Sequence, residues 1–182
     1  MAIYFIIAAD LLLLAAAILL LVFGVYTSII GPRQGAPFVP SSRRKIAVML
    51  ELARVKSGEK VLDLGSGDGA VLMAVARCGA YATGVEINPL LVWYSRGRIR
   101  MRGLAHRAVV RRGNFYDFPL GGADVVLLYL WPSTVARLRE KMERELKPGA
   151  RVVSQAFSIP GWMPVHEENG IFLYHPGVKN QS

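Results

Sequence analysis

The stretch Val61-Leu62-Asp63-Leu64-Gly65-Ser66-Gly67-Asp68-Gly69-Ala70 decides the fold. Its apolar first half has the composition of a buried strand, and its glycine-rich second half has that of a tight turn that opens a helix. The order strand, glycine turn and helix is typical of folds that bind a cofactor at a helix N-terminus. We therefore expect a cofactor site at this turn.

Outward from this stretch, apolar strand-like runs alternate with helical segments. Such alternation, with nearly continuous apolar runs in the strands, predicts a parallel sheet that is covered by helices on both faces. We expect strands over 60–64, 81–87, 108–112, 124–130 and 151–157, helices over about 42–55, 70–76, 90–102 and 134–146, and a closing pair of strands over 162–166 and 170–175.

Glycine spacing alone leaves two classes of cofactor open, because Gly65, Gly67 and Ala70 also fit the dinucleotide fingerprint. Charge separates the two classes. Asp63 and Asp68 flank the glycines, and their carboxylates would repel the pyrophosphate of a dinucleotide. S-adenosylmethionine instead carries an ammonium and a sulfonium, which carboxylates attract. The turn therefore predicts S-adenosylmethionine as the cofactor.

Residues after the next two strands extend the predicted cofactor site. Glu86 ends the second strand and could accept hydrogen bonds from both ribose hydroxyls. Asn114 follows the third strand, where a side chain that contacts adenine is expected. The predicted cofactor-binding residues are Asp63, Gly65, Gly67, Asp68, Gly69, Glu86, Ile87 and Asn114.

The pattern Asp63-x-Gly65-x-Gly67-x-Gly69, together with Glu86, resembles the first two motifs of class I S-adenosylmethionine-dependent methyltransferases. Residues 65–69, 86–89 and 91–96 are similar to one subgroup, the membrane-associated protein-lysine methyltransferases whose mitochondrial members modify the c-subunit of ATP synthase and the adenine nucleotide translocase. The segments 38–41 and 160–166 resemble that subgroup's flanking motifs. The resemblance implies a Rossmann-like, doubly wound α/β sheet and a membrane-protein lysine as acceptor.

The acceptor side of the site is predicted at residues 129–132, Tyr-Leu-Trp-Pro, which follow the fourth strand. This segment is unlike the Asn/Asp-Pro-Pro-aromatic motif of enzymes that methylate amines on bases. Its place at the carboxyl end of a central strand puts it beside the cofactor turn. Tyr129, Trp131 and Pro132 are therefore the predicted catalytic residues, with aromatic rings that could hold a methylated ammonium. Simple packing of these residues stays open as the alternative.

The N-terminal segment differs in composition from the rest of the chain. Residues 11–30 carry no charge, and twenty helical residues span the roughly 30 Å hydrocarbon layer of a membrane. Gly31-Pro32 is expected to end the helix. No Lys or Arg precedes Arg33, which argues against a cleaved signal peptide. We predict a transmembrane anchor over 1–32, a linker over 33–42 and a methyltransferase domain over 43–182.

The charges around this segment predict its orientation. Arg33, Arg43, Arg44 and Lys45 follow it, so the positive-inside rule places the domain on the cytoplasmic side of the cell membrane, with a single pass. The expected partners are the bilayer, through residues 11–30, and a membrane protein with the acceptor lysine. Nucleic acid is not an expected partner. A lipid or quinone-like small molecule, and after it RNA, remain as alternative acceptors.

Three further features complete the predictions. The helix that begins at Leu90 has arginines at alternate positions, which fan around it and predict a solvated face or contact with anionic lipid headgroups. The single cysteine, Cys78, follows the apolar run 71–76 and is expected to be buried. No metal is expected, because the histidines lack metal-ligand spacing; they are His106, His166 and His175.

Overall fold

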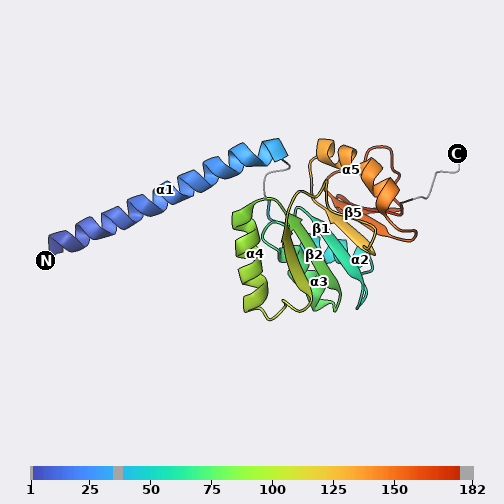
Figure 1. Cartoon of the computed structure of the whole chain (residues 1–182), viewed down its shortest axis with the longest axis horizontal. Coiled ribbons are helices and arrows are strands. Elements are labelled where there is room, and N and C mark those ends of the chain that lie inside the picture. Colours follow the sequence, from blue (N-terminus) through green and yellow to red (C-terminus); the bar gives the residue numbers. More distant parts are fainter. Residues whose placement is uncertain (1, 35–38, 177–182) are drawn as a thin grey trace. The chain divides into compact units, whose positions relative to one another are not determined.

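The computed structural model describes residues 2–34 and 39–176, and the chain divides into two compact units, Met1–Phe38 and Val39–Ser182. The first unit is a single helix, α1 (Ala2–Gln34), shown in Figure 1. The expectation that Gly31-Pro32 ends this helix is wrong, because proline removes only one backbone hydrogen bond and a helix can continue past it. Residues 35–38 of the predicted linker lie outside the described residues.

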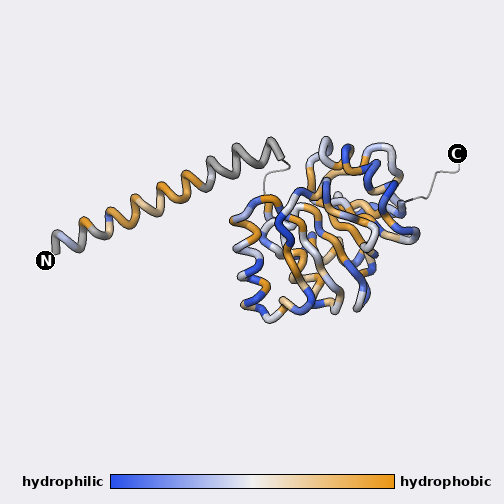
Figure 2. Tube along the Cα trace, in the orientation of Figure 1, coloured by the Kyte–Doolittle hydropathy of each residue, from blue (hydrophilic) through white to orange (hydrophobic). Residues whose placement is uncertain are grey.

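Helix α1 exposes a continuous run of apolar side chains. Every residue from Leu11 to Val22 is exposed, and this part of the helix is the orange stretch in Figure 2. Within residues 2–34 and 39–176, however, no helix combines the length and hydropathy needed to cross a membrane. The transmembrane helix predicted over residues 11–30 is therefore not confirmed.

The second unit contains a seven-stranded sheet in the order β3-β2-β1-β4-β5-β7-β6. Strands β1 to β5 run parallel, whereas β7 is antiparallel to β5 and β6 is antiparallel to β7. This is the predicted Rossmann-like α/β sheet. The strands are β1 (Lys60–Leu64), β2 (Tyr81–Glu86), β3 (Ala108–Arg112), β4 (Val125–Leu128), β5 (Arg151–Gln155), β6 (His166–Glu168) and β7 (Ile171–Tyr174).

Helices cover both faces of the sheet, because alternate strand residues point to opposite faces. One apolar cluster joins α2 (Arg43–Leu52), α3 (Ala70–Arg77) and α4 (Pro89–Met101) to one face. A second cluster joins α5 (Pro132–Glu145) to the other face (Figure 1). The two clusters hold the carboxyl ends of the parallel strands in fixed positions, and those ends carry the site described below.

Most predicted element bounds are confirmed to within a few residues, and β1 and β3 agree with the prediction at both ends. Helix α2 begins after Ser42, whose Oγ accepts a hydrogen bond from the backbone N–H of Lys45 at 3.3 Å. It ends at Leu52 and not near residue 55, since Arg54 adopts a left-handed conformation with φ of 47°.

The predicted start of the closing strand pair and the predicted burial of Cys78 are also wrong. The first strand of the closing pair lies at β6 and not at 162–166, because the two-residue turn Asn169-Gly170, with φ of 53° and 72°, fixes the hairpin register. Cys78 is exposed and not buried. It caps the C-terminus of α3, so the apolar periodicity that buries Val75 and Ala76 ends before it.

Candidate active site

The glycine-rich turn between β1 and α3 requires glycine at three positions. Gly65, Gly67 and Gly69 have φ of 82°, 50° and 74°, a region that L side chains rarely adopt. The N–H of Gly65 donates to the carbonyl of Val85 at 2.8 Å, which ties the turn to β2. Gly69 is the N-cap of α3. The glycine-rich turn therefore lies between the carboxyl end of β1 and the N-terminus of α3, where the sequence predicts it.

A fourth glycine, which was not predicted from the sequence, supports the turn from β2. A Cβ on Gly84 would lie 2.4 Å from Oγ of Ser66 and 2.6 Å from Cδ1 of Leu72. The turn therefore packs directly on the backbone of β2, with no room for a side chain between them. A glycine inside a strand is itself a signal of close backbone approach, so this position could have been found from the sequence.

Glu86 holds the turn to the end of β2. One carboxylate oxygen, Oε2, accepts from the N–H of Gly67 at 2.9 Å, and Oε1 accepts from the N–H of Asn88 at 2.8 Å. The residue is 8% exposed. A carboxylate has about four lone-pair sites, so two remain for the hydroxyls of a ribose. Ile87, half-buried, lies between Glu86 and Asn88 in this segment.

The loops after β2 and β3 are also joined. The N–H of Gly113 donates to the backbone carbonyl of Glu86 at 3.0 Å. Asn114, the next residue, is half-buried, and its Oδ1 accepts from the N–H of Tyr116 at 3.1 Å. The structure therefore brings Asn114 next to the segment that carries Glu86, where the predicted adenine contact would be made.

Asp68 is engaged by a residue of α4. Arg98 forms an ion pair with the Asp68 carboxylate and donates to the Asp68 backbone carbonyl at 2.9 Å. The Arg98 side chain is only 19% exposed, so its predicted place on a solvated face is wrong. This pairing was missed from the sequence because it joins residues thirty positions apart, which only the packing of α4 beside the turn brings together. Asp68 is thereby neutralised, and its carboxylate is a weaker attraction for a cationic cofactor than predicted.

Asp63 and Glu86 carry the remaining negative charge of the site. Asp63 is 6% exposed, and burial, followed by the charges of Glu86 and Asp68, raises its pKa from 3.8 to about 7. Among residues 2–34 and 39–176, no ion pair neutralises Asp63 or Glu86. Two buried acids without a counter-ion favour a cationic ligand. This donor set fits the ammonium and ribose of S-adenosylmethionine.

The raised pKa of Asp63 predicts a pH dependence of cofactor binding. A cation binds the ionised form of Asp63 preferentially, so affinity should rise as pH increases from about 6 to 7.5, by up to about tenfold per pH unit below the pKa, with release of a proton. Titration calorimetry in buffers of different ionisation enthalpy measures both quantities. The variant Asp63→Asn should bind more weakly and without this pH dependence.

The raised pKa of Asp63 also affects the free energy of unfolding, which should fall with rising pH whereas cofactor affinity should rise. Because the folded-state pKa of Asp63 lies above its unfolded value of 3.8, folding takes up a proton between about pH 4 and 7. The stability of the cofactor-free protein should therefore fall as pH rises through that window. Asp63→Asn should raise the melting temperature at pH 8, and a lower melting temperature there would contradict the assignment.

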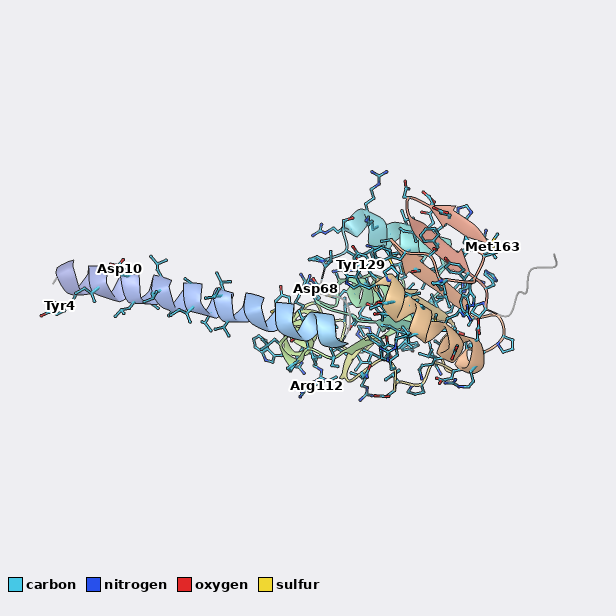
Figure 3. The ribbon with its side chains drawn as sticks, turned by 90° about the horizontal axis from the view of Figure 1, so that it is seen from above. Tyr4, Asp10, Asp68, Arg112, Tyr129 and Met163 are labelled. Atoms are coloured by element: carbon cyan, nitrogen blue, oxygen red, sulfur yellow. The ribbon has the colours of Figure 1, made fainter. Side chains whose placement is uncertain are left out.

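The acceptor segment adjoins the glycine turn through the sheet. Leu64 of β1 is in register with Leu128 of β4, so Tyr129 follows β4 beside Gly65. Tyr129 is half-buried, and Figure 3 labels it together with Asp68 of the turn. A Cβ on Gly65 would lie 3.1 Å from Cδ2 of Leu130, which confirms close contact between the two segments.

An exposed aromatic pair lies at the edge of this segment. Trp131 is 50% exposed, and its ring stacks on that of Phe157 with a centroid distance of 6.1 Å and an interplanar angle of 17°. Phe157 follows β5 and was missed from the sequence, although an aromatic residue at the carboxyl end of a parallel strand was the signal used for Tyr129. Pro132 begins α5. It contributes to the position of Trp131 as the first residue of that helix.

Comparisons with known proteins identify the family of this chain. The family model described as "ANTKMT methyltransferase domain" matches residues 63–166. A protein-lysine N-methyltransferase of Saccharolobus islandicus is 38% identical, over 70% of this chain and 81% of that protein. The human lysine N-methyltransferase of the ATP synthase c-subunit is 34% identical, over 84% of this chain and 66% of that protein.

A solved structure resembles the second unit closely. It is described as an RNA methyltransferase from Salinibacter ruber in complex with S-adenosyl-L-homocysteine, and it is 35% identical with a TM-score of 0.73. The match covers 79% of this chain and 98% of that one. The bound S-adenosyl-L-homocysteine is the demethylated product of the cofactor predicted from the acid-flanked glycine turn.

Proposed function

Because the chain belongs to the ANTKMT methyltransferase family, as an S-adenosylmethionine-dependent protein-lysine N-methyltransferase, we propose that its acceptor is a lysine of a membrane protein. The observation that carries the proposal is the stacked pair Trp131 and Phe157 beside Tyr129, at the carboxyl ends of β4 and β5. The named substrate of the human relative, the ATP synthase c-subunit, supports a membrane protein as the target.

Methyl transfer to lysine requires a neutral amine, and the aromatic side chains Tyr129, Trp131 and Phe157 can favour that form. S-adenosylmethionine supplies an activated methyl group. The acceptor amine has an ordinary pKa of about 10.4 and must lose its proton before it attacks. Partial removal from water beside the aromatic rings disfavours the charged ammonium and so favours the neutral amine. The exposed face of Trp131 also fits a methylated ammonium through cation–π contact. These residues thus bind and orient the lysine while Glu86 and Asp63 hold the cofactor.

We also propose that the enzyme works at a membrane, with its methyltransferase domain on the cytoplasmic side. The support is the apolar run Leu11 to Val22 of α1, which is exposed to solvent around the whole helix. Exposed apolar patches of this extent mark contact with a membrane or another protein. The basic residues of Arg43 to Lys45 follow α1, and positive charge is retained on the cytoplasmic side.

Methylation with radiolabelled cofactor tests the proposed acceptor. The full-length protein is incubated with membranes from cells that lack it, and protein, lipid and RNA are then separated. Label should enter protein, and mass spectrometry should locate it on lysine. Label in the lipid fraction alone would support the lipid or quinone-like acceptor instead, and label in RNA would support the RNA acceptor.

The same assay tests the membrane attachment. A variant that lacks residues 2–34 should lose most activity toward the membrane-embedded substrate, because tethering raises the effective concentration of enzyme and substrate by orders of magnitude. It should retain activity toward a soluble peptide that carries the same lysine. Equal loss on both substrates would indicate damage to the domain, and equal retention would contradict the attachment.

A further inference from the structure

Helix α4 has a second apolar face that is largely exposed within the second unit, although the guanidinium of Arg98 lies over the ring of Tyr94, 5.4 Å from its centroid. Its inner face is buried against the sheet through Leu91, Val92, Ser95 and Ile99. Its outer face carries large apolar side chains that are unusually exposed. These are Leu90 at 49%, Trp93 at 76%, Tyr94 at 51% and Met101 at 79%.

These four side chains form one stripe along the helix. At 3.6 residues per turn, Leu90, Tyr94 and Met101 recur at i, i+4 and i+11 and so lie on one side, with Trp93 at its margin. Gly97 occupies the remaining turn, and a Cβ there would have no neighbour within 4 Å. We call the set Leu90, Trp93, Tyr94 and Met101 the outer stripe.

Positive charge borders the outer stripe on the side of β3. Arg96 and Arg100 lie on that margin of the helix and are both exposed. Arg96 donates through Nε and Nη2 to the carbonyl of Val110 at 3.1 and 2.8 Å, which fixes α4 against the edge strand. Residues two apart in a strand lie on the same face of a sheet, so Arg112 lies on the same face as Val110. The Arg112 side chain is exposed and is labelled in Figure 3. Helix α4 contains no acidic residue that would offset this charge.

We propose that the outer stripe, with Arg96, Arg100 and Arg112, docks on the surface of an anionic bilayer. Tryptophan and tyrosine favour the headgroup level, where one side of the ring is apolar and the other polar. Leucine and methionine gain by leaving water, and each nearby arginine adds about 1 kcal/mol of attraction to anionic lipid, or about a fivefold gain in affinity. A nucleic acid would satisfy the arginines but leave the aliphatic side chains in water.

This docking surface would have a defined consequence for the site. Helix α4 begins directly after the segment that carries Glu86 and Asn88, so its N-terminal turn lies at the carboxyl end of the sheet. A bilayer in contact with Leu90 and Trp93 would therefore lie near the mouth of the cofactor site. A lipid contact at the outer stripe does not depend on which molecule accepts the methyl group.

Fluorescence of Trp93 in the full-length protein tests the proposal. Trp131→Phe with Trp162→Phe leaves Trp93 as the only tryptophan, and Trp93→Phe with Trp131→Phe leaves Trp162, which lies with α5 on the opposite face. Each variant is reconstituted into nanodiscs of brominated phosphatidylcholine, with or without phosphatidylglycerol. With phosphatidylglycerol, Trp93 emission should shift to shorter wavelength and be quenched, whereas Trp162 emission should do neither. Circular dichroism checks that both variants are folded.

A matched pair of charge variants separates docking from general attraction. Arg100→Glu should largely abolish the quenching of Trp93. Arg144→Glu makes the same change in net charge at an exposed position of α5 and should leave quenching unchanged. Unquenched, water-like emission of Trp93 in the discs with phosphatidylglycerol would overturn the proposal. So would a response of Trp93 to added RNA in place of lipid, which would assign the surface to nucleic acid.

Discussion

Glu86→Ala is expected to raise the dissociation constant for S-adenosylmethionine by about 100- to 10,000-fold. A hydrogen bond to a charged group contributes about 1.5–3 kcal/mol, and the variant would lose two such bonds to the ribose. It would also release the N–H groups of Gly67 and Asn88, which the carboxylate now accepts at 2.9 and 2.8 Å. The turn would then lose one of its links to β2 and keep the bond from the N–H of Gly65 to the carbonyl of Val85. Titration calorimetry measures the change directly.

Glu86→Gln is the control for this prediction. It retains the size of the side chain and one good acceptor oxygen, but it lacks the negative charge, so binding should be intermediate. Circular dichroism should show that both variants keep their secondary structure. Unchanged affinity in Glu86→Ala, or tight binding of NAD by the unmodified protein, would refute the assignment of the ribose site.

Gly84→Ala is expected to destabilise the second unit by about 1–3 kcal/mol or more and to weaken cofactor binding at the same time. The new methyl group would lie 2.4 Å from Oγ of Ser66 and 2.6 Å from Cδ1 of Leu72, distances that real Cβ atoms do not show. Leu72 can shift its side-chain end, but Ser66 lies in the glycine turn and its movement would displace the backbone N–H groups of the site. Chemical denaturation measures the stability, and calorimetry measures the binding.

A second substitution tests the cause of this loss. Within the described residues, Oγ of Ser66 is buried without a hydrogen-bond partner, so removing it breaks no hydrogen bond. The double variant Gly84→Ala, Ser66→Gly should therefore recover part of the stability, and the coupling of the two changes reports their contact. Gly97→Ala is the matched control. Its Cβ would meet nothing within 4 Å, so it should stabilise α4 by about 0.5–1 kcal/mol.

The order of strands, turns and helices along the chain could be predicted from the sequence, because each element depends mainly on neighbouring residues. Strand, glycine turn and helix follow from the residues 60–77 themselves, and the structure confirms β1, the turn and α3 in that order. The cofactor also followed from local chemistry, since Asp63 flanks the glycines and Glu86 ends the next strand. The predicted membrane span in α1 rested on composition alone, and the described residues do not confirm it.

Long-range contacts were decided only by the tertiary structure. The pairing of Arg98 with Asp68 joins two elements, and no periodicity in either element predicts it. The stacking of Trp131 on Phe157 depends on the order of β4 and β5 in the sheet.

The burial of side chains could also be predicted only in part from the sequence. An apolar run predicts a buried helix face, but where that face ends depends on the next turn, and so Cys78 is exposed. The sequence therefore determined the class of fold and the class of cofactor. The packing of α4 and of the strand ends decided which charges remain unpaired, and charge pairing depends on distances in space that spacing along the chain does not encode.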